Sequence, residues 1–376
     1  MNPTPLIRAE IDLSAVAHNV RQLRGMVDPG TVLLAAVKAN AYGHGAIPVA
    51  DTAIKNGAGY LGVARLEEAM HLRDNGITAP VLIFGYTPPA CGQYLAEHNL
   101  TQAVYSLETA AAMNASMANN GRQIKIHLKV DTGMGRLGLD ARDPKTVDEV
   151  SRLNRLENLF LEGIFTHFAT SDSADKSYAH QQFSTFTDFL DHLKSVGITP
   201  EIRHAANSGA IIDLPAAQLD MVRAGISVYG LYPSDEVRKQ RIALRPVMRL
   251  ISKIIHLKTV PAGFKVSYGA TWEAPRQTTI ATVAAGYADG YSRLLSNRGS
   301  MLVDGQHAPV VGRVCMDLTM LDVGHIPDVH VEDEVVMIGA QKDGCITADE
   351  IAEQTGTINY EVVSSITARV PRIMVT

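Results

Sequence analysis

Residues 32–45 read VLLAAVKANAYGHG, and this stretch decides how the first half of the chain is interpreted. A run of six apolar residues leads directly into Lys38 and a polar loop punctuated by glycine. An apolar run without alternation predicts a strand that is buried on both faces, as in a parallel sheet. Because a buried ammonium group is unfavourable unless it is compensated, Lys38 at the end of this strand needs a physical explanation.

Similar apolar runs recur along residues 32–230, and longer amphipathic stretches that predict helices separate them. Eight strands alternating with helices in about 200 residues predict a (β/α)8 barrel of the TIM type. Periodicity alone leaves an open, doubly wound sheet as the alternative. The eight runs are VLLAAV (32–37), YLGVA (60–64), VLIF (81–84), TQAVYS (101–106), IKIHLKV (124–130), LEGIFTHF (161–168), EIRHAA (201–206) and MVRAGISVYG (221–230).

The order of predicted elements changes after about residue 240, where strand-like segments follow one another without intervening helices. Asp304-Gly305 predicts a tight hairpin turn, and residues 347–350 have the form of a capping box that opens a helix. A chain of 376 residues also exceeds the usual size of one hydrophobic core. We therefore expect an α/β chain with a barrel over residues 11–240 and a mainly antiparallel β domain over residues 241–376.

Composition excludes several classes of function. The hydrophobic content is 46%, charged residues make up 19% and the formal net charge is −5, so neither a nucleic-acid partner nor a membrane span is expected. The N-terminus lacks the apolar region of a secretory signal. The three cysteines have neither disulfide-framework nor zinc spacing, so we expect a reduced, cytoplasmic protein without a metal site; they are Cys91, Cys315 and Cys345.

The run GMGRLG at residues 133–138 matches the G-x-G-x-x-G pattern of dinucleotide-binding proteins. That fingerprint should open a helix inside the first βαβ unit. Here the run follows the fifth predicted strand, and the next predicted helix begins only near Pro144. A glycine-rich loop that carries Arg136 into a site is therefore the better interpretation, and an NAD-dependent dehydrogenase is disfavoured.

Side chains capable of chemistry recur where the predicted strands end, which is the rim where barrel enzymes place their active sites. Lys38 could simply extend to solvent from its strand end. Because other chemically active residues share this rim, however, a buried position for Lys38 is the better interpretation. Desolvation would then lower the pKa of Lys38 and leave a neutral amine able to form a Schiff base with a cofactor carbonyl. The other residues at this rim are Lys129, Asp131, Arg136, His167, His204, Asn207, Ser208, Gly209 and Arg223.

A lysine of this kind suits pyridoxal 5′-phosphate, which also needs a phosphate-binding site. Barrels often form one after strands seven and eight. Asn207-Ser208-Gly209 and Ala224-Gly225-Ile226 lie there, and their small residues allow backbone N–H groups to approach a phosphate.

Taken together, an ordered set of motifs across almost the whole chain resembles the alanine racemase family. The motifs are AVKANAYGHG (36–45), HLKVDTGMGRLG (127–138), FTHFATSD (165–172), HAANSGA (204–210), MVRAGISVYGLYPS (221–234), VSYGATW (266–272), AAGYADGYSR (284–293), GRVCMDLTMLDV (312–323) and TINYEVVSSITARVPR (357–372). The resemblance implies a homodimer that binds pyridoxal 5′-phosphate in a barrel and pairs residues 1–10 with the C-terminal β domain. It also implies D-alanine supply for peptidoglycan.

The resemblance assigns roles position by position. Lys38 is implied as the cofactor-binding lysine and one base, and Tyr268 of the other subunit as the opposite base. Arg223 is implied to face the pyridine nitrogen, with His167 linking it to that tyrosine. The remaining implied roles are phosphate or cofactor binding by Tyr42, Asn207, Ser208, Gly225, Ile226 and Tyr360, substrate binding by Arg136 and the Met316 backbone, channel narrowing by Tyr287, and carbamylation of Lys129.

Two groups on opposite faces of a planar carbanion are the economical arrangement for moving a proton from one face to the other. An arginine at the pyridine nitrogen cannot accept a proton there, which weakens the electron sink and disfavours transamination. Three alternatives remain: a racemase of broader specificity, a barrel-type decarboxylase that uses pyridoxal phosphate, and a non-catalytic protein that binds this cofactor. Arg223 and Tyr268 speak against the decarboxylase, and a second domain that delivers a base speaks against the non-catalytic protein.

Overall fold

The computed structural model describes residues 5–118 and 120–376, which divide into two compact units. One unit comprises Ala15–Ala41 and Ala46–Arg245. The other comprises the described residues up to Ser14 together with Tyr42–Gly45 and Pro246–Thr376.

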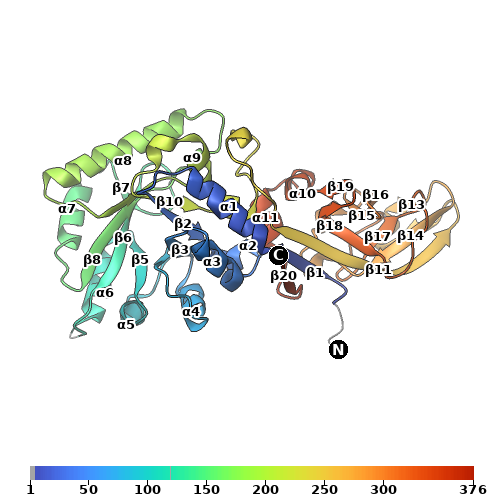
Figure 1. Ribbon diagram of the computed structural model, residues 1–376, viewed down its shortest axis with the longest axis horizontal. Coiled ribbons are helices and arrows are strands. Elements are labelled where there is room, and N and C mark those ends of the chain that lie inside the picture. Colours follow the sequence, from blue (N-terminus) through green and yellow to red (C-terminus); the bar gives the residue numbers. More distant parts are fainter. Residues whose placement is uncertain (1–4, 119) are drawn as a thin grey trace. The chain divides into compact units, whose positions relative to one another are not determined.

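The first unit is built on a parallel sheet whose strands follow the order β10-β2-β3-β4-β5-β6-β8-β9, with the short β7 beside β6 (Figure 1). The ends of this order are joined by backbone hydrogen bonds from Asp220 N to Arg203 O (3.0 Å) and from Arg223 N to Ala206 O (2.9 Å). The predicted barrel is therefore confirmed, and the open sheet is excluded. The strands are β2 (Val32–Ala36), β3 (Tyr60–Val63), β4 (Val81–Ile83), β5 (Leu100–Val104), β6 (Ile124–Asp131), β7 (Leu139–Asp140), β8 (Leu159–Phe165), β9 (Ile202–His204) and β10 (Met221–Ala224).

Helices connect successive strands of the barrel, as parallel pairing requires. Ser106 caps α6, because its hydroxyl accepts a hydrogen bond from Thr109 N. All residues of β3, β4 and β5 are buried. For β3 and β4 this is the two-sided burial that their apolar sequences predicted, whereas β5 also buries the polar Thr101 and Gln102. The helices are α1 (Leu13–Gly25), α2 (Lys38–Tyr42), α3 (Ala46–Lys55), α4 (Leu66–Asp74), α5 (Gly92–Glu97), α6 (Leu107–Ser116), α7 (Lys145–Leu153), α8 (Ser177–Ser195) and α9 (Ser208–Asp213).

The second unit is a mainly antiparallel sheet with the strand order β16-β15-β18-β11-β1-β20, to which β14, β17 and β19 attach. The long β11 pairs antiparallel with β1, β14 and β18, whereas β1 and β20 run parallel. The mainly antiparallel architecture predicted for the C-terminal part is confirmed. The strands are β1 (Arg8–Asp12), β11 (Met248–Val260), β12 (Lys265–Val266), β13 (Trp272–Glu273), β14 (Thr278–Val283), β15 (Ser300–Val303), β16 (Gln306–Pro309), β17 (Thr319–Asp322), β18 (Glu334–Gln341), β19 (Gly344–Ile346) and β20 (Arg372–Val375).

Local signals in the second unit have their expected structures. Asp304 and Gly305 have φ angles of 51° and 79° and join β15 to β16 as a two-residue hairpin turn. Thr347 caps α10 (Ala348–Thr355) by accepting a hydrogen bond from Glu350 N at 3.0 Å, and α11 (Asn359–Ser364) follows. Residues 1–10 were expected to pair with this sheet. Residues 1–4 lie outside the described residues, and β1, which begins at Arg8, pairs with β11 and β20.

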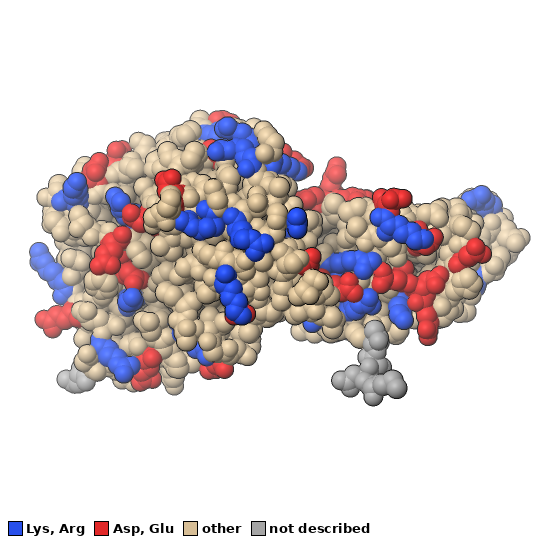
Figure 2. Space-filling view, viewed as in Figure 1, with Lys and Arg blue, Asp and Glu red and all other residues tan. Residues whose placement is uncertain are grey.

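Lys, Arg, Asp and Glu side chains are interspersed over the face seen in Figure 2. Among residues 5–118 and 120–376, no helix has the combined length and apolar character needed to cross a lipid bilayer.

Candidate functional site

Lys38 follows the end of β2 by two residues, and the backbone after it is left-handed. Ala39, Asn40, Ala41 and Tyr42 have φ angles between 51° and 54°, so α2 is a left-handed turn. This conformation costs roughly 1–2 kcal/mol per residue for L-amino acids other than glycine and asparagine. Backbone strain of this kind is typical of functional sites.

Side chains hold the left-handed turn at both ends. The Glu68 carboxylate accepts hydrogen bonds from Ala39 N at 2.6 Å and from Ala64 N at 2.7 Å. At the other end, the Asn40 side chain accepts a hydrogen bond from Ala46 N at 2.8 Å. These contacts compensate part of the strain and fix the direction in which Lys38 leaves its strand.

The environment of Lys38 favours its neutral amine. Burial, followed by the nearby Arg136 guanidinium, lowers the pKa of Lys38, whereas Glu68 acts in the opposite direction. A neutral lysine is the nucleophilic form that attacks a carbonyl carbon. The surroundings of this lysine therefore shift its equilibrium towards the nucleophilic form.

Arg223 lies on β10 and is buried, yet the hydrogen-bond partners described below are all uncharged acceptors. One nitrogen, Nη1, contacts His204 Nδ1 at 2.9 Å. The other, Nη2, donates to Thr166 O at 2.7 Å and to Ala205 O at 2.9 Å, and it contacts His167 Nδ1 at 3.3 Å. Burial and then Arg136 lower the pKa of Arg223 to about 9, so it remains a cation at neutral pH.

Further basic groups gather around Arg223. Lys129 is buried on β6, its Nζ lies 4.9 Å from the centre of the Phe165 ring, and among the described residues it has no hydrogen-bond partner. Burial, then Arg223 and Arg136, hold the pKa of Lys129 well below its usual value. The pKa of His167 is likewise well below its usual value, because of burial first and then the charge of Arg223.

Positive charge on this group of basic residues is disfavoured by the other basic residues more than it is favoured by nearby carboxylates. Glu68 acts on Lys38 and Asp131 acts on Lys129, but Arg136 opposes the charged form of Lys38, Lys129, His167 and Arg223. An anionic ligand would relieve this repulsion. The donor set therefore fits a phosphate-bearing cofactor together with a substrate carboxylate, and it fits a divalent cation poorly.

The end of the barrel after β9 and β10 offers small groups for binding a phosphate. Asn207 caps α9 through a hydrogen bond from Ala210 N at 3.1 Å, and Ser171 Oγ donates to the same side chain at 2.7 Å. Ser208 Oγ accepts a hydrogen bond from Gly225 N at 2.8 Å. Ile226 begins a short 3₁₀ helix directly after Gly225. The structure thus brings both predicted small-residue segments together.

The remaining predicted residues lie in the second unit. The Tyr42 and Tyr360 rings are neighbours, with centroids 6.1 Å apart. Tyr287 N donates to Cys315 O, and Ala288 N donates to Met316 O, both at 3.0 Å, so the segments of Tyr287 and Met316 lie side by side. Tyr268 follows Ser267, whose φ is 67° and whose hydroxyl donates to Arg313 O at 2.6 Å. The Tyr268 side chain is 70% exposed and is available to another molecule.

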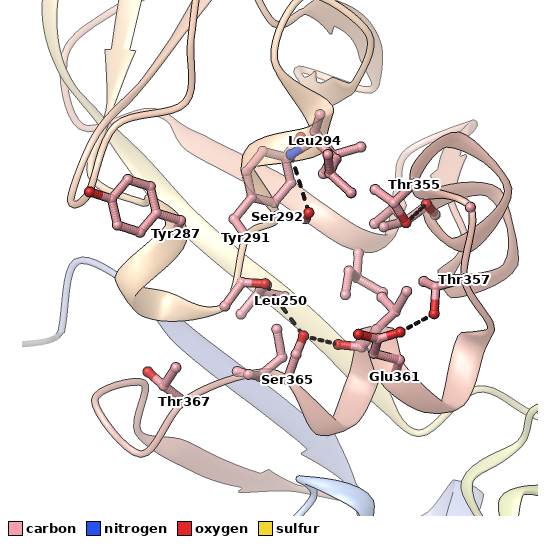
Figure 3. Close-up of a pocket in the computed structure, with 17 residues that line it drawn as sticks. Leu250, Tyr287, Tyr291, Ser292, Leu294, Thr355, Thr357, Glu361, Ser365 and Thr367 are labelled. Carbon is pink, nitrogen blue, oxygen red and sulfur yellow. Dashed lines mark hydrogen bonds between the residues drawn. The ribbon is translucent and has the colours of Figure 1, made fainter.

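A separate cavity of about 490 Å³ lies within the second unit (Figure 3). Its apolar lining includes Leu250, Leu295 and Ile351, and its polar lining includes Ser365 and Glu361. Figure 3 shows Tyr287 at one side, with its ring extending away from the other labelled side chains. None of the basic barrel residues lines this cavity.

Sequence reasoning missed two buried residues of the barrel, His127 and Glu162, and it placed His204 at the rim without connecting it to them. They form a hydrogen-bonded chain that ends at Arg223. A polar residue within an otherwise apolar strand is the available signal, as in IKIHLKV. Among the described residues, no group of three or more His, Cys, Asp or Glu side chains is arranged to hold a metal ion.

Comparisons with known proteins agree across the chain. Residues 11–233 match a family model described as the N-terminal domain of alanine racemase, and residues 247–374 match the model of its C-terminal domain. An alanine racemase of Desulfosudis oleivorans is 52% identical over 372 residues, which cover 97% of this chain and 95% of that protein.

Solved structures extend the comparison to the fold. The alanine racemase of Clostridium difficile 630 superposes with a TM-score of 0.94 at 41% identity and covers 100% of this chain and 97% of that one. A histidine racemase from Leuconostoc mesenteroides superposes with a TM-score of 0.90 at 31% identity, covering 100% and 99% of the two chains. Racemases of different amino acids therefore share this architecture.

Proposed function

This chain belongs to the alanine racemase family, and on that premise we propose that it interconverts L-alanine and D-alanine with pyridoxal 5′-phosphate as its cofactor. The observation that carries the proposal is the half-buried Lys38 amine, which lies near basic groups whose positive charge is disfavoured by burial and by Arg136. When bound, pyridoxal phosphate supplies a carbonyl carbon for the substrate amine and a ring that delocalises the electron pair left by α-proton removal.

Lys38 would hold the cofactor, and further residues would bind the rest of it. Asn207, Ser208, Gly225 and Ile226 supply small polar groups and backbone N–H donors for the phosphate, and Tyr42 and Tyr360 supply hydroxyls. Arg223 would face the pyridine nitrogen of the bound cofactor. Since arginine has only donors, it cannot draw a proton onto that nitrogen in the way that a carboxylate would.

Proton transfer uses two groups on opposite faces of the substrate. The Lys38 amine serves one face, and the Tyr268 hydroxyl of a second copy of the chain serves the other. A tyrosine with its usual pKa near 10 is a poor base at neutral pH. His167 accepts from Arg223 at Nδ1, which leaves an N–H at Nε2 to donate to the phenolate and stabilise it.

The substrate carboxylate binds to the exposed Arg136 and to the backbone of Met316 from the second copy. Tyr287 lies beside that backbone and narrows the approach to it. Lys129, carbamylated, would become an anion placed to hold Arg136. We further propose that the protein is a homodimer with shared active sites, that it is located in the cytoplasm, and that it supplies D-alanine for peptidoglycan.

Incubation with L-alanine in D₂O tests this function. The expected product is D-alanine that carries deuterium at its α-carbon, together with a visible absorption band from the bound cofactor. Chiral chromatography and mass spectrometry measure the product. Release of ethylamine and CO₂ would instead indicate a decarboxylase, and absence of any turnover by the cofactor-loaded protein would contradict the proposal.

A broader racemase is the second candidate, and the 31% identical histidine racemase is the observation that favours it. The 52% identity to an alanine racemase favours the narrower function. The values of kcat/KM for alanine, serine and histidine distinguish the two. Comparable values for all three would replace alanine racemase by the broader enzyme.

Replacing Arg223 by glutamate should raise transamination relative to racemisation. A carboxylate can hold a proton on the pyridine nitrogen, which strengthens the electron sink and favours transfer of the amino group to the cofactor with release of pyruvate. We also expect racemisation to fall by about 10²-fold, as on loss of a positioned electrostatic contact. The measurement is the ratio of pyruvate to D-alanine formed, with Arg223→Lys as the charge-matched control. An unchanged ratio would exclude this role for Arg223.

A further inference from the structure

A chain of hydrogen bonds crosses the interior of the barrel from Arg223 to Glu162. Arg223 Nη1 and His204 Nδ1 are 2.9 Å apart, His204 Nε2 and His127 Nδ1 are 2.8 Å apart, and His127 Nε2 and Glu162 Oε2 are 3.1 Å apart. All four side chains are buried. At the far end, Lys125 Nζ donates to Glu162 Oε1 at 2.7 Å.

The chemistry of the two ends dictates the direction of every bond in this chain. A guanidinium only donates, so His204 Nδ1 must accept and its proton must lie on Nε2. That proton is donated to His127 Nδ1, which places the His127 proton on Nε2. An ionised carboxylate only accepts, so Glu162 receives it. The requirements of both ends agree, and both imidazoles are neutral.

The protonation states required by this order have physical support. Burial lowers the pKa of His127 and holds that of His204 well below its usual value. Burial alone would raise the pKa of Glu162, but hydrogen bonds from His127 and Lys125 lower it to about 2. The expected state at neutral pH is therefore one carboxylate, two neutral imidazoles and one guanidinium.

Neighbouring residues pack closely against the two imidazole rings of this hydrogen-bonded chain. A Cβ atom at Gly163 would lie 2.7 Å from the Cε1 and Nε2 atoms of His127, so a side chain at this position would displace the ring. The Phe165 ring stacks on His204 with centroids 4.7 Å apart and planes 10° apart. Packing thus fixes both imidazole planes, and only their tautomers remain to be chosen.

We propose that Glu162 is a positioning residue for racemisation, because it fixes the tautomers of His127 and His204 and so holds the Arg223 guanidinium in the orientation that faces the cofactor ring. This inference rests on the proposed function. Through the two imidazoles, Glu162 also places a negative charge at the far end of the hydrogen bonds of Arg223.

The substitution Glu162→Gln should reverse the donor-to-acceptor direction of the hydrogen bonds between residue 162 and His204. Lys125 only donates, so it keeps the new carbonyl oxygen, and the amide NH₂ then faces His127. His127 must accept at Nε2, its proton moves to Nδ1, and His204 then carries its proton on Nδ1 against the Arg223 donor. Loss of one hydrogen bond to a charged group predicts a fall in kcat of about tenfold, with KM for alanine changed by less than about threefold.

A second substitution should restore the original direction. In Glu162→Gln combined with Lys125→Met, nothing competes for the amide oxygen, so the carbonyl can turn to accept from His127. We expect both tautomers and most of the lost kcat to return. Lys125→Met alone leaves the carboxylate in place and should change kcat by less than about twofold, since its side chain is 44% exposed.

The test combines kinetics with ¹⁵N NMR of histidine-labelled protein, recorded without and with cofactor. His127→Gln and His204→Gln variants assign the two signals. Tautomer reversal and slower turnover in Glu162→Gln, both corrected in the double variant, support the proposal. Unchanged tautomers, or unchanged kcat despite reversed tautomers, overturn it, as does failure of the double variant to restore either.

Tyr60→Phe separates this role from general packing. Tyr60 donates at 3.0 Å to Glu162 Oε2, the oxygen that His127 also contacts, but Tyr60 is not part of the hydrogen-bonded chain that leads to Arg223. A kcat loss in Tyr60→Phe equal to that of Glu162→Gln would overturn the positioning role. The NMR measurement on cofactor-free protein does not depend on turnover, so a failure of the proposed function is distinguishable from a failure of this inference.

Discussion

Replacing Lys38 by alanine should abolish racemisation, with a loss of about 10⁴-fold or more, because one residue both binds the cofactor covalently and serves as a base. The visible absorption band of the bound cofactor should disappear with the activity. D-alanine formation and the absorption spectrum of the purified variant are the two measurements.

The matched control for this prediction is Lys55→Ala. Lys55 lies on α3 and is exposed, and it pairs with Asp51 one turn away at 2.6 Å. The Lys55→Ala variant should keep both the absorption band and the activity. A Lys38→Ala protein that kept both would show that the amine acting on the substrate lies elsewhere.

Tyr268→Phe should produce the second large effect, a loss of racemisation of about 10²- to 10⁴-fold, as expected for removal of one acid–base group. The remaining base still reaches one face of the substrate. In D₂O, the α-proton of one enantiomer should therefore continue to exchange with retention of configuration, and that of the other should not. Proton NMR of L-alanine and D-alanine incubated separately measures both rates.

A control and a mixing experiment sharpen this prediction. Tyr94→Phe removes the hydroxyl of another exposed tyrosine and should leave both rates unchanged. If Lys38 and Tyr268 of one active site come from different copies, mixed dimers of Lys38→Ala and Tyr268→Phe chains contain one intact site. Random re-association should then restore about a quarter of the wild-type activity. Equal exchange of both enantiomers by Tyr268→Phe would contradict its role as one of two bases.

Strands and turns that depend on short stretches of sequence could be predicted from the sequence. Unbroken apolar runs such as VLLAAV predicted buried parallel strands, and Asp304-Gly305 predicted the turn between β15 and β16. Both depend on neighbouring residues, for which sequence patterns are informative. The pairing of β1 with β11 joins segments about 240 residues apart, and no local pattern contains that information.

Two features of the site lay beyond local patterns. The left-handed turn after Lys38 includes alanines and a tyrosine, and of its four residues only Asn40 has a preference for that conformation. The chain from Arg223 to Glu162 joins side chains from β10, β9, β6 and β8, and only closure of the barrel brings them into contact. The presence of basic residues at the strand ends was predictable, whereas their electrostatic coupling required the structure.

The most direct test of the central claim is reduction of the cofactor-loaded protein with borohydride, followed by proteolysis and mass spectrometry. Reduction makes the bond between the cofactor and its lysine permanent, so the modified peptide identifies that residue. We expect a single phosphopyridoxyl group on Lys38. Modification of a different lysine, or a protein that carries no phosphopyridoxyl group after reduction, would contradict it.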